Sequence, residues 1–180
     1  LVQARGFKNK DDDVKKENNT DEVSNTKVKR EPNITILALT YDSEIGQLIL
    51  SGEGYGGVQV NAGFSGQETT SSKISNDEWS VVIPGKVIAG KQKLFAYLLG
   101  KEGKVLDKSS LIISGKAIER ANGKTLVIVQ KGDALWNIAY QRLGLGTRYL
   151  DIVELNRDKI SNPDLIYPKQ LFILPNKLAN

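Results

Sequence analysis

The chain has 180 residues and a net charge of +4, and it contains no Cys, His or Met. Without His or Cys it lacks the usual ligands of catalytic zinc, the Cys nucleophile and the Ser-His triad, and among hydrolases a carboxylate glycosidase or a Ser-Lys hydrolase stays chemically open. Basic and acidic residues number eight and seven over 1–33, eight and eight over 34–118, and six and five over 125–175, so no segment concentrates the positive charge typical of nucleic-acid binding.

Residues 1–33 include a stretch, 10–22, that is dense in charged and amide side chains and almost free of apolar ones. Such a segment cannot bury enough surface to offset about 1–2 kcal/mol per residue of backbone ordering, so we expect a disordered tail. No apolar run in the chain reaches the roughly 18–20 residues of a transmembrane helix. Because Met is absent, we do not expect Leu1 to be a translation start: the chain is either processed or begins downstream of a leader, and a membrane anchor would have to lie upstream.

From Ile34 to Ala117 the sequence consists of short β-rich runs separated by turn signals. Several such strands at near-regular spacing predict an antiparallel sandwich rather than βαβ units. The glycine-rich stretch 51–57 predicts a turn, because Gly adopts positive φ without steric cost. The expected strands are Ile34–Tyr41, Leu48–Leu50, Val58–Val60, Trp79–Ile83, Lys93–Leu99 and Leu111–Ile113.

Three stretches of this region, Glu78-Trp-Ser-Val-Val-Ile-Pro, Gly90-Lys-Gln-Lys-Leu-Phe-Ala-Tyr and Gly103-Lys-Val-Leu-Asp, resemble the bacterial Ig-like domain of envelope proteins. Glu78 stands where that pattern usually has Gly, so the turn before it is expected to differ in type. With no Cys pair, burial must hold the sandwich, and Trp79, Phe95 and Tyr97 are the expected anchors at about 150–250 Å² each. The alternative for Trp79 is an exposed carbohydrate platform, but Trp79, Val81 and Ile83 share one strand face, which favours the core.

Residues 118–124 are interpreted as a linker, and the chain after them alternates between strand and helix patterns. Leu126–Val129 is an apolar strand typical of burial on both faces, and Leu171–Leu174 is its expected antiparallel partner. Gly132 permits a turn, and Asp133 is placed to cap a helix over Ala134–Leu143. In that helix Leu135, Ile138 and Ala139 recur at i, i+3 and i+4, and Tyr149, Ile152 and Val153 repeat the pattern over Arg148–Asn156.

Three stretches of this last part of the sequence resemble the LysM domain. They are Thr125-Leu-Val-Ile-Val-Gln, Lys131-Gly-Asp-Ala-Leu-Trp-Asn-Ile-Ala and Asn162-Pro-Asp-Leu-Ile-Tyr-Pro-Lys-Gln-Leu-Phe-Ile-Leu-Pro. The resemblance implies a βααβ fold over residues 125–176 that binds N-acetylglucosamine-containing glycans such as peptidoglycan and chitin. In this family the glycan lies in a shallow groove between two loops, and the resemblance implies that binding requires no cofactor. The implied contacts are Gly132, Asp133, Ala134, Leu135, Asn162, Pro163, Asp164, Leu165 and Ile166.

Several of these residues also have purely structural interpretations. A role in the fold alone is an equal alternative for Gly132, Asp133, Pro163 and Pro168. Leu135 and Ile138 are expected in the core. Trp136 lies off the apolar stripe, so it either packs against the final loop or lines the groove. Two residues depart from the LysM pattern: Ala134 replaces the usual Thr, and Lys169 replaces a turn glycine, which predicts a different local conformation.

The fold class expected is therefore multidomain, with an all-β Ig-like sandwich over 34–117 followed by a small α+β LysM domain over 125–176. The expected function is non-catalytic peptidoglycan binding in the bacterial cell envelope, in the periplasm or on the cell wall. The alternative is an adaptor or sensor in which the Ig-like domain docks an envelope protein partner and LysM only localises the chain. An enzyme is the third hypothesis, but no spacing selects a catalytic pair among Asp42, Glu44, Glu53, Asp77 and Glu78.

Overall fold

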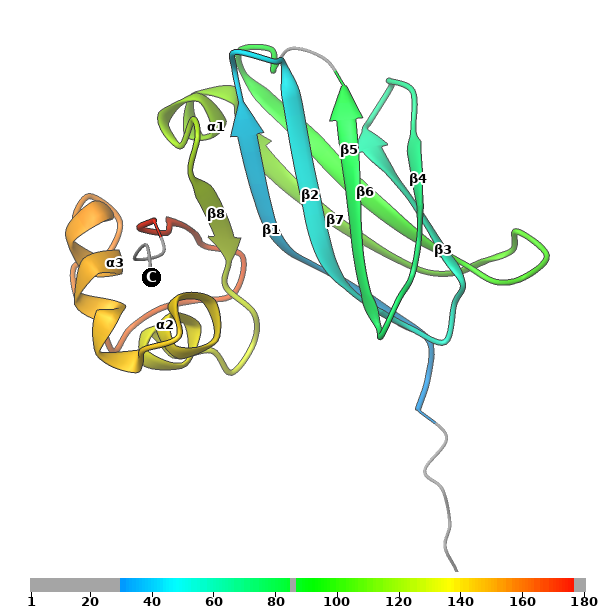
Figure 1. The fold of residues 1–180 in the computed structure, drawn as a ribbon. Coiled ribbons are helices and arrows are strands. Elements are labelled where there is room, and N and C mark those ends of the chain that lie inside the picture. Colours follow the sequence, from blue (N-terminus) through cyan, green and yellow to red (C-terminus); the bar gives the residue numbers. More distant parts are fainter. Residues whose placement is uncertain (1–29, 85–86, 177–180) are drawn as a thin grey trace, which may run out of the picture.

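The computed structural model describes residues 30–84 and 87–176, which form mostly antiparallel β-sheet with a few short helices (Figure 1). The tail predicted to be disordered, 1–33, lies outside the described residues as far as residue 29. None of the helices in the described part of the chain has the length and apolar content that crossing a membrane requires.

The strands form two antiparallel sheets. The first has the order β5 (Glu78–Pro84), β2 (Gln47–Tyr55), β1 (Asn33–Asp42), β8 (Thr125–Ile128), β9 (Leu171–Ile173). The second has the order β4 (Thr70–Lys73), β3 (Gln59–Phe64), β6 (Lys91–Leu99), β7 (Val105–Ser114). All six strands expected from the sequence between residues 34 and 113 are present, and β4 is an additional one.

The two sheets pack face to face over one hydrophobic core. In β5 the period-two pattern buries Trp79, Val81 and Ile83, so the prediction that Trp79 is a core residue is confirmed, with 3% of it exposed. Its indole nitrogen also has a partner, because Nε1 donates a hydrogen bond to the carbonyl oxygen of Glu53 over 3.0 Å. A buried indole N–H without an acceptor would be costly, and this bond removes the cost.

The prediction that Phe95 and Tyr97 anchor this core is wrong. In β6 the core positions belong to Leu94, Ala96 and Leu98, each completely buried. Successive side chains of a strand point to opposite faces, so Phe95 and Tyr97 lie on the outer face of the second sheet. There the two rings contact each other, with centroids 4.8 Å apart.

The glycine-rich stretch 51–57 is not a turn throughout, because β2 continues to Tyr55. A Cβ atom at Gly52 would overlap the backbone of Thr35 and lie 2.8 Å from the Trp79 ring, and one at Gly54 would lie 3.3 Å from the same ring. These two glycines therefore leave room for the buried indole. The chain turns later, at Gly56, where φ is +80°.

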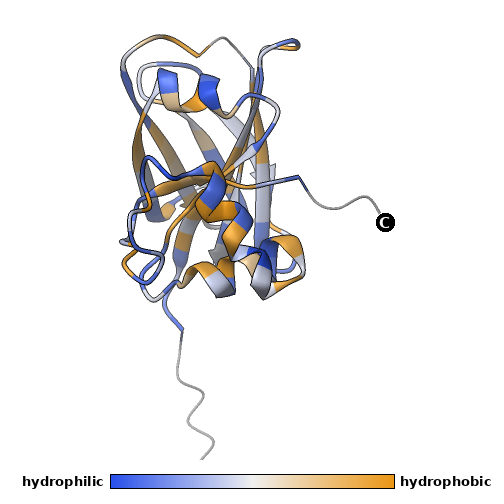
Figure 2. Ribbon diagram, turned by 90° about the vertical axis from the view of Figure 1, so that its left-hand side faces the viewer, coloured by the Kyte–Doolittle hydropathy of each residue, from blue (hydrophilic) through white to orange (hydrophobic). Residues whose placement is uncertain are grey.

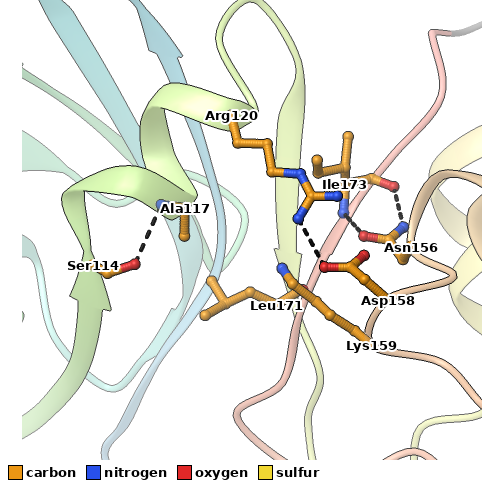
Figure 3. Close-up of polar contacts among 8 residues, drawn as sticks. All are labelled: Ser114, Ala117, Arg120, Asn156, Asp158, Lys159, Leu171 and Ile173. Atoms are coloured by element: carbon orange, nitrogen blue, oxygen red, sulfur yellow. Dashed lines mark hydrogen bonds and ion pairs between the residues drawn. The ribbon is translucent and has the colours of Figure 1, made fainter.

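The segment interpreted as a linker, 118–124, is more ordered than a simple connection. Its first residues belong to helix α1 (Gly115–Arg120), which begins at Ser114, whose hydroxyl accepts the amide hydrogen of Ala117 (Figure 3). Ile118 and Ala121 are buried in the core of the sandwich. Apolar burial therefore fixes the path of the chain between β7 and β8.

Strand β8 joins the C-terminal residues to the sandwich. Leu126 lies opposite Ile173 and Val127 opposite Phe172, so the predicted pairing of the two C-terminal strands is confirmed. The other edge of β8 pairs with β1, Ala38 lying opposite Val127, which the sequence did not predict. Figure 1 shows β8 between β1 and the C-terminal helices, as an interior strand of one continuous sheet.

Candidate functional site

The C-terminal helices cover one face of the β8–β9 hairpin. They are α2 (Leu135–Leu143), the 3-10 turn η1 (Gly146–Arg148) and α3 (Tyr149–Leu155). Figure 2, which faces these helices, shows hydrophobic and hydrophilic residues mixed along them, the pattern of helices with one buried face. Leu135, Ile138 and Ala139 are buried together, so the predicted apolar stripe of α2 is confirmed. With the hairpin they form a second core, whose buried residues are Val127, Val129, Leu135, Ile138, Ala139, Ile152, Ile160, Phe172 and Leu174.

Two loops contain all of the candidate glycan contacts except Leu135, which is the first residue of α2, and the first loop starts beside the end of the second at one end of the hairpin. Val129 donates its amide hydrogen to the carbonyl of Gln170 over 2.9 Å and accepts the amide hydrogen of Lys169 over 2.8 Å. Val129 directly precedes the loop 130–134, and Lys169 and Gln170 end the loop 161–170. The backbone pairing therefore brings together two segments that are some thirty residues apart in the chain.

The candidate contacts differ in exposure. Gly132, Ala134, Asn162, Asp164 and Leu165 are exposed, with Leu165 58% accessible, while Asp133, Pro163 and Ile166 are half-buried. Leu135 is only 3% exposed, and Ile166 packs against the same core. A ligand on these loops therefore meets the backbone and the Leu165 side chain before it meets Leu135.

Asp133 closes its own loop instead of capping α2, so the predicted N-cap is wrong. Its Oδ2 atom accepts the amide hydrogen of Gln130 over 2.8 Å, and the N-cap residue is Ala134, without a side-chain bond to the helix. Gly132, at φ +90°, turns the chain so that the carboxylate reaches back to the start of the loop.

The second loop is also closed by its own side chains. Oδ1 of Asn162 accepts the amide hydrogen of Asp164 over 3.0 Å, and Oε1 of Gln170 accepts that of Tyr167 over 2.7 Å. Lys169 has φ +72°, the left-handed conformation that Gly adopts without steric cost. The local conformation is therefore one that suits glycine although Lys occupies it, contrary to the change predicted for this position.

Trp136 packs against η1, a contact that neither interpretation of the sequence included. A Cβ atom at Gly146 would overlap the indole ring, so Gly146 is the surface on which Trp136 lies. On α2 itself the ring is stacked on Tyr140, with centroids 5.5 Å apart and an interplanar angle of 7°. Trp136 remains 51% exposed.

Asn156 is a buried polar residue that sequence reasoning missed. Its Nδ2 atom donates to the carbonyl oxygen of Ile152 over 2.7 Å. Nδ2 also donates to the carbonyl oxygen of Ile173 over 2.9 Å, and Oδ1 accepts the amide hydrogen of Ile173 over 2.8 Å (Figure 3). An Asn at the end of a predicted helix was the available signal. The three bonds fix α3 to the outer edge of β9, so they hold the second loop between two anchored elements.

Two charged residues after α3 connect it to neighbouring elements (Figure 3). Asp158 pairs with Arg120 of α1 at 2.7 Å, and this hydrogen bond holds the pKa of the Asp158 carboxyl below its ordinary value. Lys159 donates a hydrogen bond to the carbonyl oxygen of Leu171 over 3.0 Å, and burial lowers the pKa of its ammonium group.

A cleft of about 890 Å³ lies between α2 and the outer face of the first sheet. Asp133 lines it, so the cleft begins at the first of the two loops. Its polar lining comes from both sides: Ser51, Glu53, Ser72, Lys73, Ser75, Asn76, Glu78, Ser80, Gln130, Asp133, Gln141 and Arg142. Apart from Asp133, none of these residues was expected to belong to a glycan site.

Of the five acids weighed for catalysis, Glu53 and Glu78 lie opposite each other on β2 and β5. Asp42 accepts amide hydrogens from Glu44 and Ile45 in the β1–β2 turn, and Asp77 pairs with Arg30 at 3.8 Å in the β4–β5 turn. Across residues 30–84 and 87–176, no three His, Cys, Asp or Glu side chains are grouped so that they could hold a metal ion.

Comparison with known proteins gives one family. Neither the curated proteins nor the solved structures yielded a match to the chain. Residues 127–175, which contain both loops, α2, α3 and β9, match the family model of the LysM domain, a module typical of cell-wall and envelope-associated proteins that generally binds N-acetylglucosamine-containing glycans such as peptidoglycan.

Proposed function

We propose that this chain is a non-catalytic, peptidoglycan-binding protein of the bacterial envelope, and that residues 132–135 and 162–166, on and beside the two loops, contact the glycan. The observation that carries the proposal is the joining of these two loops, at one end of the β8–β9 hairpin, within the segment that matches the LysM model. The contacts proposed are Gly132, Asp133, Ala134, Leu135, Asn162, Pro163, Asp164, Leu165 and Ile166.

The chemistry of the loops suits a neutral amido sugar. An acetamido group needs an amide acceptor and donor and an apolar contact for its methyl group. The exposed backbone around Gly132 and Ala134 supplies the polar groups, and the exposed Leu165 side chain supplies the apolar contact. No residue has to change protonation for such binding.

Preorganisation also supports the proposal. The Asp133 carboxylate closes the first loop, and the Asn162 amide oxygen closes the second. A loop that already has its bound shape loses less conformational entropy when a ligand binds, so more of the contact energy appears as affinity.

For the rest of the chain we propose an Ig-like sandwich over residues 34–117 that serves as a spacer or as a docking module for an envelope partner. Two antiparallel sheets packed over a common core support this assignment. The chain would then act in the periplasm or at the cell wall, with the sandwich setting the distance between the glycan and whatever precedes residue 30.

The direct test is sedimentation of the full chain with insoluble peptidoglycan, beside a verified LysM protein. We expect the chain to pellet, and chitin oligomers to shift the amide resonances of residues 131–136 and 162–168. Asn162→Ala should weaken binding several-fold, because it opens the second loop. Asn122→Ala is the matched control, since Asn122 accepts the amide hydrogen of Ser43 in an exposed turn away from both loops. A chain that stays in the supernatant while the LysM control pellets would refute the proposal.

A further inference from the structure

We propose that the cleft between α2 and the first sheet binds the peptide that a peptidoglycan strand carries on its sugars. The inference rests on the proposed function, because the loops must first hold the glycan. Asp133 belongs to the first loop and also lines the cleft. A peptide attached to a sugar on the loops would therefore enter the cleft directly.

The two sides of the cleft come from different parts of the chain. Ile138, Gln141 and Arg142 of α2 form one wall, and the outward residues of β2 and β5 form the floor. Pairing of β8 with β1 fixes these sides relative to each other. A volume of about 890 Å³ lies within the range of roughly 300–1,000 Å³ found for small-molecule sites, which is room for a few peptide residues.

Charges on the floor favour a ligand with an amino group. Glu53 lies opposite Glu78 in the register of β2 and β5, and like charges in that arrangement destabilise a sheet. Among the described residues, the ion pairs involve neither of these carboxylates. An ammonium group bound between them would remove the repulsion.

The other polar groups of the cleft complement the rest of a peptide. Arg142 and Lys73 are cationic and also stand outside the ion pairs of the described part of the chain, so they are available to a carboxylate. Ser51 lies opposite Ser80 in the same register, two residues along each strand from Glu53 and Glu78, and all four residues line the cleft. The two serine hydroxyls can donate to and accept from peptide groups. The cleft thus carries charges of both signs, as a ligand with amino and carboxylate groups requires.

A continuation of the glycan itself fits the cleft less well. The aromatic residue in its lining is Trp79, which is 3% exposed and turned into the sandwich core, so it offers no ring face for a sugar. A neutral sugar can donate hydroxyl hydrogens to Glu53 and Glu78, but it carries no charge that would offset the repulsion between them. The charge pattern therefore selects the peptide.

The test compares two ligands on the full chain by isothermal titration and amide NMR. One is a chitin oligomer, and the other is a peptidoglycan fragment of equal glycan length that carries its peptide. We expect the peptide to tighten binding by about threefold to tenfold, the contribution of one or two exposed ion pairs. The double variant Glu53→Gln/Glu78→Gln should remove this gain and leave the affinity for chitin oligomer unchanged. Glu68→Gln/Glu102→Gln is the control, because it makes the same charge change on exposed loops outside the cleft.

Each outcome separates the two proposals. If neither ligand binds, the proposed function fails and this inference falls with it. If the chitin oligomer binds and the peptide adds nothing, or if the cleft variant behaves like the control, the inference alone is overturned. If longer chitin oligomers bind more tightly and the cleft variant abolishes that gain, the cleft holds glycan and the peptide assignment is wrong.

Discussion

Gln130 donates a hydrogen bond from Nε2 to the carbonyl oxygen of Ile36, 94 residues earlier in the chain, over 3.2 Å. The same atom lies 2.8 Å from the carbonyl oxygen of Ile128. Ile36 is the residue at which the register of β1 against β2 shifts, and the β1–β8 ladder begins at Ala38. Gln130, in the segment that matches the LysM model, thus extends the contact between this segment and the sandwich beyond the last pair of β1 and β8.

Replacing Gln130 by Met should destabilise the whole chain by about 1–3 kcal/mol, because two half-buried carbonyl groups lose a donor while the side-chain length is kept. Urea unfolding followed by tryptophan fluorescence reports both parts, since Trp79 lies in the sandwich and Trp136 in the LysM segment. Gln141→Met, an exposed position on α2, is the control and should change stability by less than about 0.5 kcal/mol. Equal effects of the two variants would contradict the role given to Gln130.

Asn156→Ala should cost about 2–5 kcal/mol, because it removes three buried hydrogen bonds and leaves both backbone groups of Ile173 without this partner. Thermal and urea unfolding measure the loss. Asn122→Ala removes one hydrogen bond at an exposed turn and should cost far less. A similar small effect at both positions would show that Asn156 does not anchor α3 to β9.

Lys169→Gly should stabilise the protein by about 0.5–1 kcal/mol. A residue with a Cβ atom at positive φ costs about 1–2 kcal/mol, which Gly avoids. The greater backbone entropy that Gly loses on folding offsets only part of this gain. Lys169→Ala removes the same charge but keeps the Cβ atom, so its stability should remain near that of the unchanged chain. Destabilisation by the Gly variant would mean that the left-handed conformation is not the relevant one.

The Arg120–Asp158 pair predicts a titration that can be measured at a single residue. The Asp158 carboxyl should titrate below its ordinary pKa of 3.8, and Arg120→Gln should bring the pKa back towards that value. Since the folded-state pKa is lowered, the stabilisation by this pair is complete above 3.8 and is lost as the pH falls through the lower folded value. Carboxyl NMR of both chains gives the two pKa values directly, and identical values would exclude the pair in solution.

Much of the C-terminal fold could be predicted because its residues act locally. The spacing of Leu135, Ile138 and Ala139 states which helix face is buried, and the apolar runs around Leu126 and Phe172 are long enough to identify a strand pair. Asp133 was harder, because cap and loop closure use the same carboxylate and differ only in which amide it reaches. Gly132 decides between them through its positive φ.

What could not be predicted depends on residues far apart in sequence. Gly52 and Gly54 read as turn residues because their real partner, the indole of Trp79, lies on another strand. Phe95 and Tyr97 were predicted as core anchors because aromatic rings are usually buried. In β6, however, the alternate residues Leu94, Ala96 and Leu98 face the core. The cleft forms because β8 pairs with β1, and no local sequence pattern around Ala38 or Val127 predicts that pairing.

The position of β8 between β1 and β9 bears on how the protein would carry tension. Leu126, Ile128 and Ile173 are buried against the sandwich core, so cutting the chain before Thr125 would leave them facing water. We therefore expect the C-terminal segment to be less stable when it is fused to other proteins without the sandwich. In the function proposed above, a pull on the glycan would load the hydrogen bonds between β8 and β1, and the sandwich would move together with the C-terminal segment.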